Sequence, residues 1–340
     1  MSEQLTPERE REIIDQLGQL RRQVDAELSR VVIGQKDVVR QLLISLLAGG
    51  HCLITGAPGL AKTLLVKSIA ELFSLKFSRI QFTPDLMPAD ITGTEVLEED
   101  GAGHRAMRFL PGPIFANVLL ADEINRTPPK TQSALLEAMQ EHQVTAAGTR
   151  HVLDEPFFVL ATQNPIEMEG TYPLPEAQLA RFMFNVLIDY LSEDDEVAVV
   201  QQTTSRAPDT ITPQFEGHHV RDFNQIVQRV PVAEDVTRYA VRLASASRPG
   251  QSGASDFVQQ YVSWGAGLRA AQYLILGGKA AALLDGRSYV SAADVRDLAR
   301  PVMRHRILPN YRAEAEGLTT ETIIENLVET VEHPRQEAVA

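Results

Sequence analysis

The stretch Gly56-Ala57-Pro58-Gly59-Leu60-Ala61-Lys62-Thr63 decides the fold of this chain. It follows the short apolar segment 51–55 and precedes the segment 64–73, in which leucine and isoleucine recur at helical spacing. A buried strand, a turn rich in glycine and proline, and a helix that opens with Lys-Thr form the context that a phosphate-binding P-loop requires. The alternative is an ordinary glycine-rich turn between a strand and a helix.

A loop of this kind binds an anion through its backbone, because glycines let the N–H groups turn inward and the helix N-terminus adds roughly half a positive charge. We expect Lys62 to reach the β- and γ-phosphates of ATP, and the Thr63 hydroxyl to ligate Mg²⁺. The general pattern has Gly before the Lys, whereas this chain has Ala61, whose methyl group is tolerated if the residue has helical φ and ψ. The residues predicted to contact ATP or ADP here are Gly56, Ala57, Pro58, Gly59, Leu60, Ala61, Lys62, Thr63 and Leu64.

Composition narrows the class of protein. The 340 residues include 32 basic and 45 acidic ones, and the resulting net charge of −13 argues against a general nucleic-acid or anionic-membrane surface. The one cysteine, Cys52, falls in a predicted core strand, which indicates a reducing compartment. No apolar run has the length of a membrane span. We therefore expect a cytoplasmic protein that does not insert into a membrane.

The order of apolar segments predicts an α/β fold. Five segments have the length and composition of buried strands: 51–55, 77–82, 118–121, 157–162 and 182–188. They alternate with helical patterns, which indicates a P-loop αβα sandwich around a central parallel sheet. Region 83–113 is too long for a simple loop and is expected to carry an inserted element, and 143–154 is expected to form a hairpin.

The character of the chain changes near residue 190. The segments 193–202, 233–244, 264–284 and 292–300 are all predicted to be helical, with no convincing strand among them. We therefore predict two domains, a nucleotide-binding domain over residues 1–190 and a smaller all-α lid domain over residues 191–340.

Two acids follow the apolar strand 118–121. At the carboxyl end of a central strand, Asp122 is placed to hold Mg²⁺ and Glu123 to polarise the attacking water as a general base. Asn164, which follows the next predicted strand, is placed to orient that water and to sense the γ-phosphate. The alternatives are solvated acids at the end of a strand and an amide that caps a turn before Pro165.

These motifs together resemble the MoxR group of AAA+ ATPases, in which an alanine commonly precedes the P-loop lysine. The resemblance includes the P-loop, the sequence Ala-Asp-Glu-Ile-Asn-Arg at 121–126, the segment 128–141, the sequence Ala-Thr-Gln-Asn-Pro at 161–165 and the segment 174–182. A looser similarity extends through the C-terminal third. Segment 94–113 resembles the insert that the family carries in its second helix, and segment 143–157 resembles the hairpin before the strand called sensor 1.

The resemblance also implies roles for residues outside the P-loop. Val32, Ile33 and Gly34 match the turn that contacts adenine. Arg181 matches the arginine finger that acts on the nucleotide of the neighbouring subunit, although the family commonly has Asp where Ala180 stands, and a surface ion pair is the alternative. Arg269 matches the lid arginine called sensor 2, within a divergent segment.

The function implied by the resemblance is ATP hydrolysis with Mg²⁺, coupled within a homo-oligomeric ring, expected to be a hexamer, to chaperone-like maturation of protein complexes. The family often acts with a partner that bears a von Willebrand factor A domain. A ring motor acting on nucleic acid, a chelatase-type ATPase subunit and a non-hydrolysing scaffold are the alternatives. Arg126 is left open between a contact to nucleotide, a contact to a neighbouring subunit and a cap on the next helix.

Overall fold

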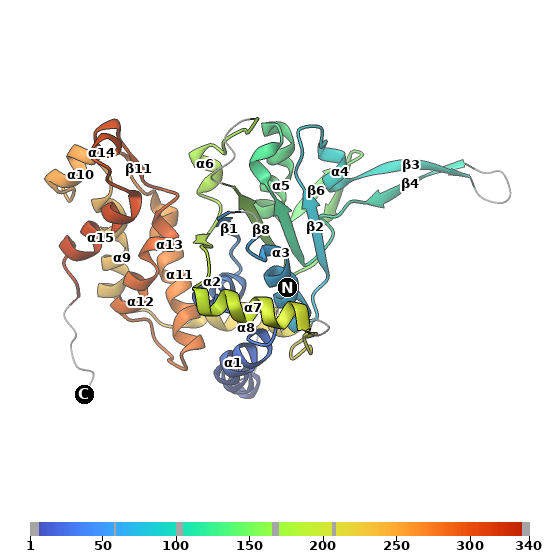
Figure 1. Cartoon of the computed structure of the whole chain (residues 1–340), viewed down its shortest axis with the longest axis horizontal. Helices are drawn as coiled ribbons and strands as arrows, with labels where there is room; N and C mark the ends of the chain where they lie inside the picture. The colour runs from blue at the N-terminus through green and yellow to red at the C-terminus, as the bar shows by residue number, and fades with distance from the viewer. Residues whose placement is uncertain (1–6, 58, 100–104, 165–169, 206–208, 335–340) are drawn as a thin grey trace.

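The computed structural model describes residues 7–57, 59–99, 105–164, 170–205 and 209–334. Pro58, one of the predicted phosphate-loop residues, lies outside the described residues. Figure 1 shows a central sheet with helices around it, a long two-stranded ribbon that extends away from the body, and a group of C-terminal helices on the opposite side.

The central sheet has five parallel strands in the order β2-β5-β8-β1-β9. The strands are β1 (Cys52–Thr55), β2 (Phe77–Gln81), β5 (Val118–Asp122), β8 (Phe158–Gln163) and β9 (Phe184–Leu187). All five were predicted from the sequence, and the α/β class is confirmed. Because the strands are parallel, their carboxyl ends meet at one edge of the sheet, the edge where α/β proteins bind their ligands.

Alternate residues of β1, β5 and β8 enter two separate hydrophobic cores. Cys52 and Ile54 of β1 pack into one core, and Leu53 between them packs into the other. The first core contains α1 (Pro7–Leu28), α2 (Lys36–Leu47) and α3 (Lys62–Leu72), and the second contains α5 (Pro129–Glu141). Cover on both faces explains why β1, β5 and β8 each begin with an unbroken apolar run.

Two inserts leave this core. The first, predicted for 83–113, consists of α4 (Pro88–Thr92) and an antiparallel ribbon of β3 (Gly93–Glu99) and β4 (Arg105–Pro111). The second is the expected hairpin, β6 (Gln143–Ala146) paired with β7 (Thr149–Val152). Its turn residues, Ala147 and Gly148, both have positive φ, as a tight two-residue hairpin turn requires.

The C-terminal part is mainly helical, but two predictions for it are wrong. A small antiparallel pair, β10 (Val262–Trp264) with β11 (Leu308–Pro309), occurs where no strand was expected. Trp264 therefore lies in a strand, and the helix predicted to begin there begins at Leu268. The helix predicted over 292–300 is two helices. The helices of this part are α7 (Glu193–Ser205), α8 (Gly217–Arg229), α9 (Glu234–Ala246), α10 (Asp256–Tyr261), α11 (Leu268–Leu284), α12 (Ala292–Asp297), α13 (Ala299–Met303), α14 (Tyr311–Ala315) and α15 (Thr320–Thr330).

Helix α11 is the centre of this C-terminal part. It packs on α9 and α12, and also on α1, α2 and α8. Close approach is possible because Gly277 faces the core, where an added Cβ would stand 2.9 Å from a Leu298 methyl and 3.0 Å from the Met183 methyl. Among the described residues, no helix is long and apolar enough to cross a membrane.

Asp285, at the end of α11, connects this part to the N-terminal helices. Its carboxylate accepts from Arg40 of α2 at 2.8 and 2.9 Å and from Arg21 of α1 at 2.7 Å, and Arg287 adds a third guanidinium. Burial raises the pKa of Asp285, but the hydrogen bonds and charges of Arg40, Arg287 and Arg21 outweigh it and hold the pKa below its usual value.

We expect Asp285→Asn to lower the free energy of unfolding by about 1 kcal/mol at pH 7, because three arginines lose their common counter-ion. Since the pKa of Asp285 is lower in the folded than in the unfolded chain, this stabilisation is present at neutral pH and disappears as the pH falls below about 4. Urea unfolding at several pH values measures it. Asp25→Asn is the control, because the nearest Arg21 nitrogen is 3.9 Å from Asp25. An equal loss in both variants would contradict the assignment.

Candidate functional site

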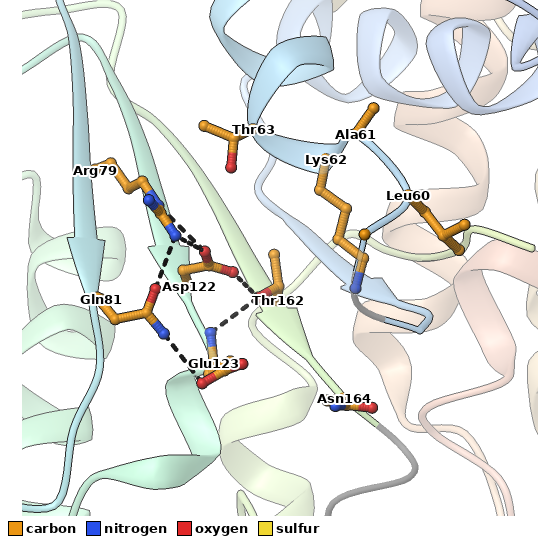
Figure 2. A pocket seen from close by; sticks show the side chains of 11 residues that line it. Leu60, Ala61, Lys62, Thr63, Arg79, Gln81, Asp122, Glu123, Thr162 and Asn164 are labelled. Carbon is orange, nitrogen blue, oxygen red and sulfur yellow. Dashed lines mark hydrogen bonds and ion pairs between the residues drawn. The ribbon is translucent and has the colours of Figure 1, made fainter. Parts of the chain in front are cut away.

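A cavity of about 400 Å³ lies at the carboxyl edge of the sheet. Three chain segments that the sequence singled out meet here: the loop after β1, the acids after β5, and the polar residues at the end of β8 (Figure 2). The described residues that line it are Gly59, Leu60, Ala61, Lys62, Thr63, Arg79, Gln81, Asp122, Glu123, Thr162 and Asn164.

The loop after β1 curls back on itself. Lys62 Nζ donates to the carbonyl oxygen of Gly56 at 2.5 Å, so the ammonium group lies over the turn of the loop. An added Cβ on Gly56 would stand 2.3 Å from the carbonyl oxygen of Ile188, which requires glycine at this position. Partial burial lowers the pKa of Lys62, while the carboxylates of Asp122 and Glu123 oppose that shift.

Ala61 does not have the helical backbone that its methyl group was expected to need. It is the N-cap residue of α3 with φ 54° and ψ 25°, in the left-handed region. An L-residue in this region costs about 1 kcal/mol or more relative to glycine. Ala61 therefore bears the backbone strain that a glycine would relieve, and the loop turns sharply into the helix.

Thr162, which the sequence did not single out, joins the two acids. Its hydroxyl donates to Asp122 Oδ1 at 2.6 Å and accepts from the backbone N–H of Glu123 at 2.8 Å. Glu123 itself has a left-handed backbone, with φ 56° and ψ 51°. One buried hydroxyl thus orients the Asp122 carboxylate and the strained turn that carries Glu123.

Two residues of β2 were also missed. Arg79 donates to Asp122 Oδ2 at 2.6 Å, and Gln81 Nε2 donates to Glu123 Oε2 at 3.0 Å (Figure 2). Their only sequence signal is that they stand two residues apart on a predicted strand, which places both side chains on one face. Arg126, left open from the sequence, donates to Glu123 Oε2 at 3.3 Å.

The donor set suits Mg²⁺ carried on a nucleotide. The Thr63 hydroxyl and the Asp122 carboxylate line the same cavity, and hard oxygen ligands are those that Mg²⁺ prefers. Within the described ranges, no group of three or more His, Cys, Asp or Glu side chains could hold a metal by itself. The remaining ligands would be water and phosphate, as is usual for magnesium in nucleotide sites.

A second cavity, of about 420 Å³, adjoins the first and is lined mainly by apolar side-chain surface. Gly59, Leu60 and Ala61 line both cavities. Helix α7 closes one side of it, which the sequence did not indicate. The other described lining residues are Val31, Val32, Ile33, Gln35, Leu64, Leu191, Glu196, Val199, Val200, Gln202, Thr203 and Asp209.

The residues predicted outside the first cavity fall into two groups: those at the second cavity, and two arginines that line neither cavity. Val32, Ile33 and Leu64 line the second cavity, and an added Cβ on Gly34 would stand 2.7 Å from Asp195 Oδ2 of α7. Of the described arginines predicted to act on nucleotide, Arg181 and Arg269 line neither cavity. Arg269 instead lines a groove with Glu176 and Ala180, beside the turn that carries Arg181.

The comparisons agree with this geometry. Residues 51–184 match the model of the ATPase family associated with various cellular activities (AAA), and residues 255–327 match the AAA lid domain. The fold and the site thus define an AAA+ ATPase with a helical lid. The chain belongs to the MoxR family of these ATPases, as its relatives show.

Chaperone MoxR1 of Mycobacterium tuberculosis is 41% identical over 314 residues, 92% of this chain and 82% of that protein. YeaC of Bacillus subtilis is 40% identical over 310 residues, 91% of this chain and 93% of that protein. The crystal structure of a candidate ATPase from Cytophaga hutchinsonii is 40% identical, with a TM-score of 0.88, and covers 96% of this chain and 98% of that one.

We expect Thr162→Val to lower the free energy of unfolding by about 2 kcal/mol, because the buried N–H of Glu123 and an oxygen of Asp122 lose their partner. Thr162→Ser, which keeps the hydroxyl and loses one methyl group, should cost about 1 kcal/mol. Urea unfolding followed by circular dichroism measures both. A valine variant as stable as the serine variant would show that the bridge contributes nothing.

Proposed function

We propose that this chain binds ATP with its phosphates in the first cavity and its base in the second, and hydrolyses it in an oligomeric ring. The observation that supports this most directly is that Gly59, Leu60 and Ala61 line both cavities. A polar cavity and an apolar one joined by a single loop match the two ends of a nucleotide.

The chemistry follows from the residues that line the first cavity. Lys62 would hold the β- and γ-phosphates, and Thr63 with Asp122 would hold Mg²⁺, which neutralises phosphate charge when bound. Glu123 would polarise the attacking water, and Asn164 would orient it. Phosphoryl transfer to water depends on positioning and charge neutralisation more than on covalent chemistry.

The cation that completes the charge would come from another subunit. In the first cavity Lys62 would supply a positive charge to the phosphates, while Arg79 is paired with Asp122. Arg269 lines a separate groove with Ala180, the residue before Arg181. We therefore propose that Arg181 acts as an arginine finger on the nucleotide of the neighbouring subunit. Arg269 would contact that same nucleotide, also from the adjacent subunit. A homo-oligomeric ring, a hexamer by family analogy, would bring both arginines to the neighbouring nucleotide.

The cellular role is proposed from the relatives. One of them is named a chaperone, which supports a chaperone-like role in maturing protein complexes, with a von Willebrand factor A-domain protein as the expected partner. We also propose that the protein acts in the cytoplasm. The proposed domains are residues 1–190, which bind the nucleotide, and residues 191–340, which form the lid.

We expect ATP turnover per chain to rise with protein concentration as the ring assembles. Glu123→Gln and Arg181→Ala should each lower turnover by about a thousandfold or more, because one removes the general base and the other the trans-acting cation. Both should still bind ATP. Radiolabelled phosphate release, with mass photometry at each concentration, measures this.

Turnover per chain that stays flat from monomer upward would contradict the ring mechanism. Normal hydrolysis by Arg181→Ala would remove the finger assignment and leave a self-contained nucleotide site. Arg238→Ala is the matched control, since Arg238 pairs with Glu234 on the exposed surface of α9 and should have wild-type turnover.

The second cavity gives an independent test of the base site. Val199→Asp places a charge against the base and should weaken ATP binding by about tenfold or more. Val197, on the same helix but half exposed and outside the cavity lining, provides the control variant Val197→Asp, which should bind ATP normally. Titration with a fluorescent ATP analogue compares them. Equal affinities would place the base elsewhere.

A further inference from the structure

The turn that carries Arg181 is held by the C-terminal helices. Four consecutive carbonyl oxygens, those of Ala180, Arg181, Phe182 and Met183, each accept a hydrogen bond from a side chain of residues 273–306. This turn lies between α6 (Glu176–Leu179) and β9, so it belongs in sequence to the sheet domain. Its backbone, however, is bonded to the lid.

Arg306 makes most of these bonds. Its guanidinium donates to Ala180 O at 3.0 Å, to Met183 O at 3.3 Å and to Phe182 O, and it also bonds to Val302 O. Arg306 is 6% exposed, and burial lowers its pKa to about 9, which leaves it a cation at neutral pH. A buried cation is costly unless carbonyl dipoles surround it, and here the turn supplies three of them.

Two further lid residues complete the contact. Tyr273 OH donates to Arg181 O at 3.1 Å, and the Arg306 guanidinium carbon lies 5.2 Å from the centre of the Tyr273 ring. The ring of His305 is hydrogen-bonded to Phe182 O at 3.1 Å. Burial lowers the pKa of His305 far below its usual value, so the ring is neutral, and the charge at the turn comes from Arg306.

The side chain of Arg181 has a different anchor. Its Nη1 donates to the carbonyl oxygen of Leu136 on α5, at 2.6 Å. The backbone of Arg181 is thus bonded to the lid, while its guanidinium is bonded to a helix of the sheet domain. A displacement of the lid relative to α5 would pull on both ends of this one side chain.

We propose that Tyr273, Arg306 and His305 are positioning residues that make Arg181 move with the lid, so that lid position controls when the guanidinium leaves Leu136 and reaches the next subunit. This inference rests on the proposed function, because it assumes that Arg181 acts on a neighbouring nucleotide. Beyond the proposed function, the inference identifies the lid as the part of the chain that positions Arg181. Tyr273, Arg306 and His305 line neither cavity of the proposed nucleotide site, and they would act through Arg181.

Tyr273→Phe is the sharpest test, since it removes one hydroxyl and keeps the ring under the Arg306 guanidinium. We expect kcat to fall about fivefold, the factor set by one ordinary hydrogen bond, with ATP affinity unchanged. Arg306→Lys keeps a charge but reaches fewer carbonyls and should reduce kcat further. The controls are Tyr261→Phe and Arg312→Lys, two lid substitutions at side chains that bond to Glu316 and not to the Arg181 turn.

A double-mutant cycle separates positioning from general damage. If Tyr273 acts through Arg181, then Arg181→Ala combined with Tyr273→Phe has the same kcat as Arg181→Ala alone. A further fivefold loss in the double variant would overturn the inference, as would an unchanged kcat in Tyr273→Phe. Full activity of Arg181→Ala alone would instead show that the proposed finger is wrong, so the two failures are distinguishable.

Discussion

The site depends on the parallel pairing of β8 with both β1 and β5. These strands are almost entirely buried, and their register aligns Thr55 with Gln163 and Ala121 with Ala161. The carboxyl ends of β1, β5 and β8 are thereby brought to one edge of the sheet, although more than a hundred residues separate the first from the last. A slip of one residue would turn the side chains at these ends to the opposite face. Two separate cores, one on each face, make such a slip costly, because every apolar side chain would exchange its environment.

The parts of this arrangement that sequence could predict are those with a local cause. A P-loop is a contiguous pattern, and five apolar segments alternating with helices leave few folds other than a covered parallel sheet. Asp122 and Glu123 could be predicted as site residues because they end a buried strand. The helix over 217–229 also has a local signal, the helical spacing of Val220, Phe223 and Val227.

What the sequence could not supply depends on register and on packing between distant segments. Thr162 is apparent as the bridge between the acids only once β8 is aligned with β5, and Arg79 and Gln81 only once β2 is placed beside β5. The strands β10 and β11 have three and two residues, too few for any periodicity to be recognised. The placement of α7 over the second cavity depends on tertiary contacts that its mostly exposed side chains do not reveal.

Two residues that line the site, Ala61 and Glu123, have a strained backbone. Each lies in the left-handed region and costs about 1 kcal/mol or more, a cost that persists only where the surroundings hold the backbone. Glu123 is held by Thr162 at its N–H and by Gln81 and Arg126 at its carboxylate. These bonds and the strained backbone fix the direction of the Glu123 side chain without any ligand. The turn at Arg181 is built differently, because its backbone is bonded to the lid and its side chain to α5. Glu123 is therefore held by bonds within the sheet domain, whereas Arg181 is held jointly by the sheet domain and the lid.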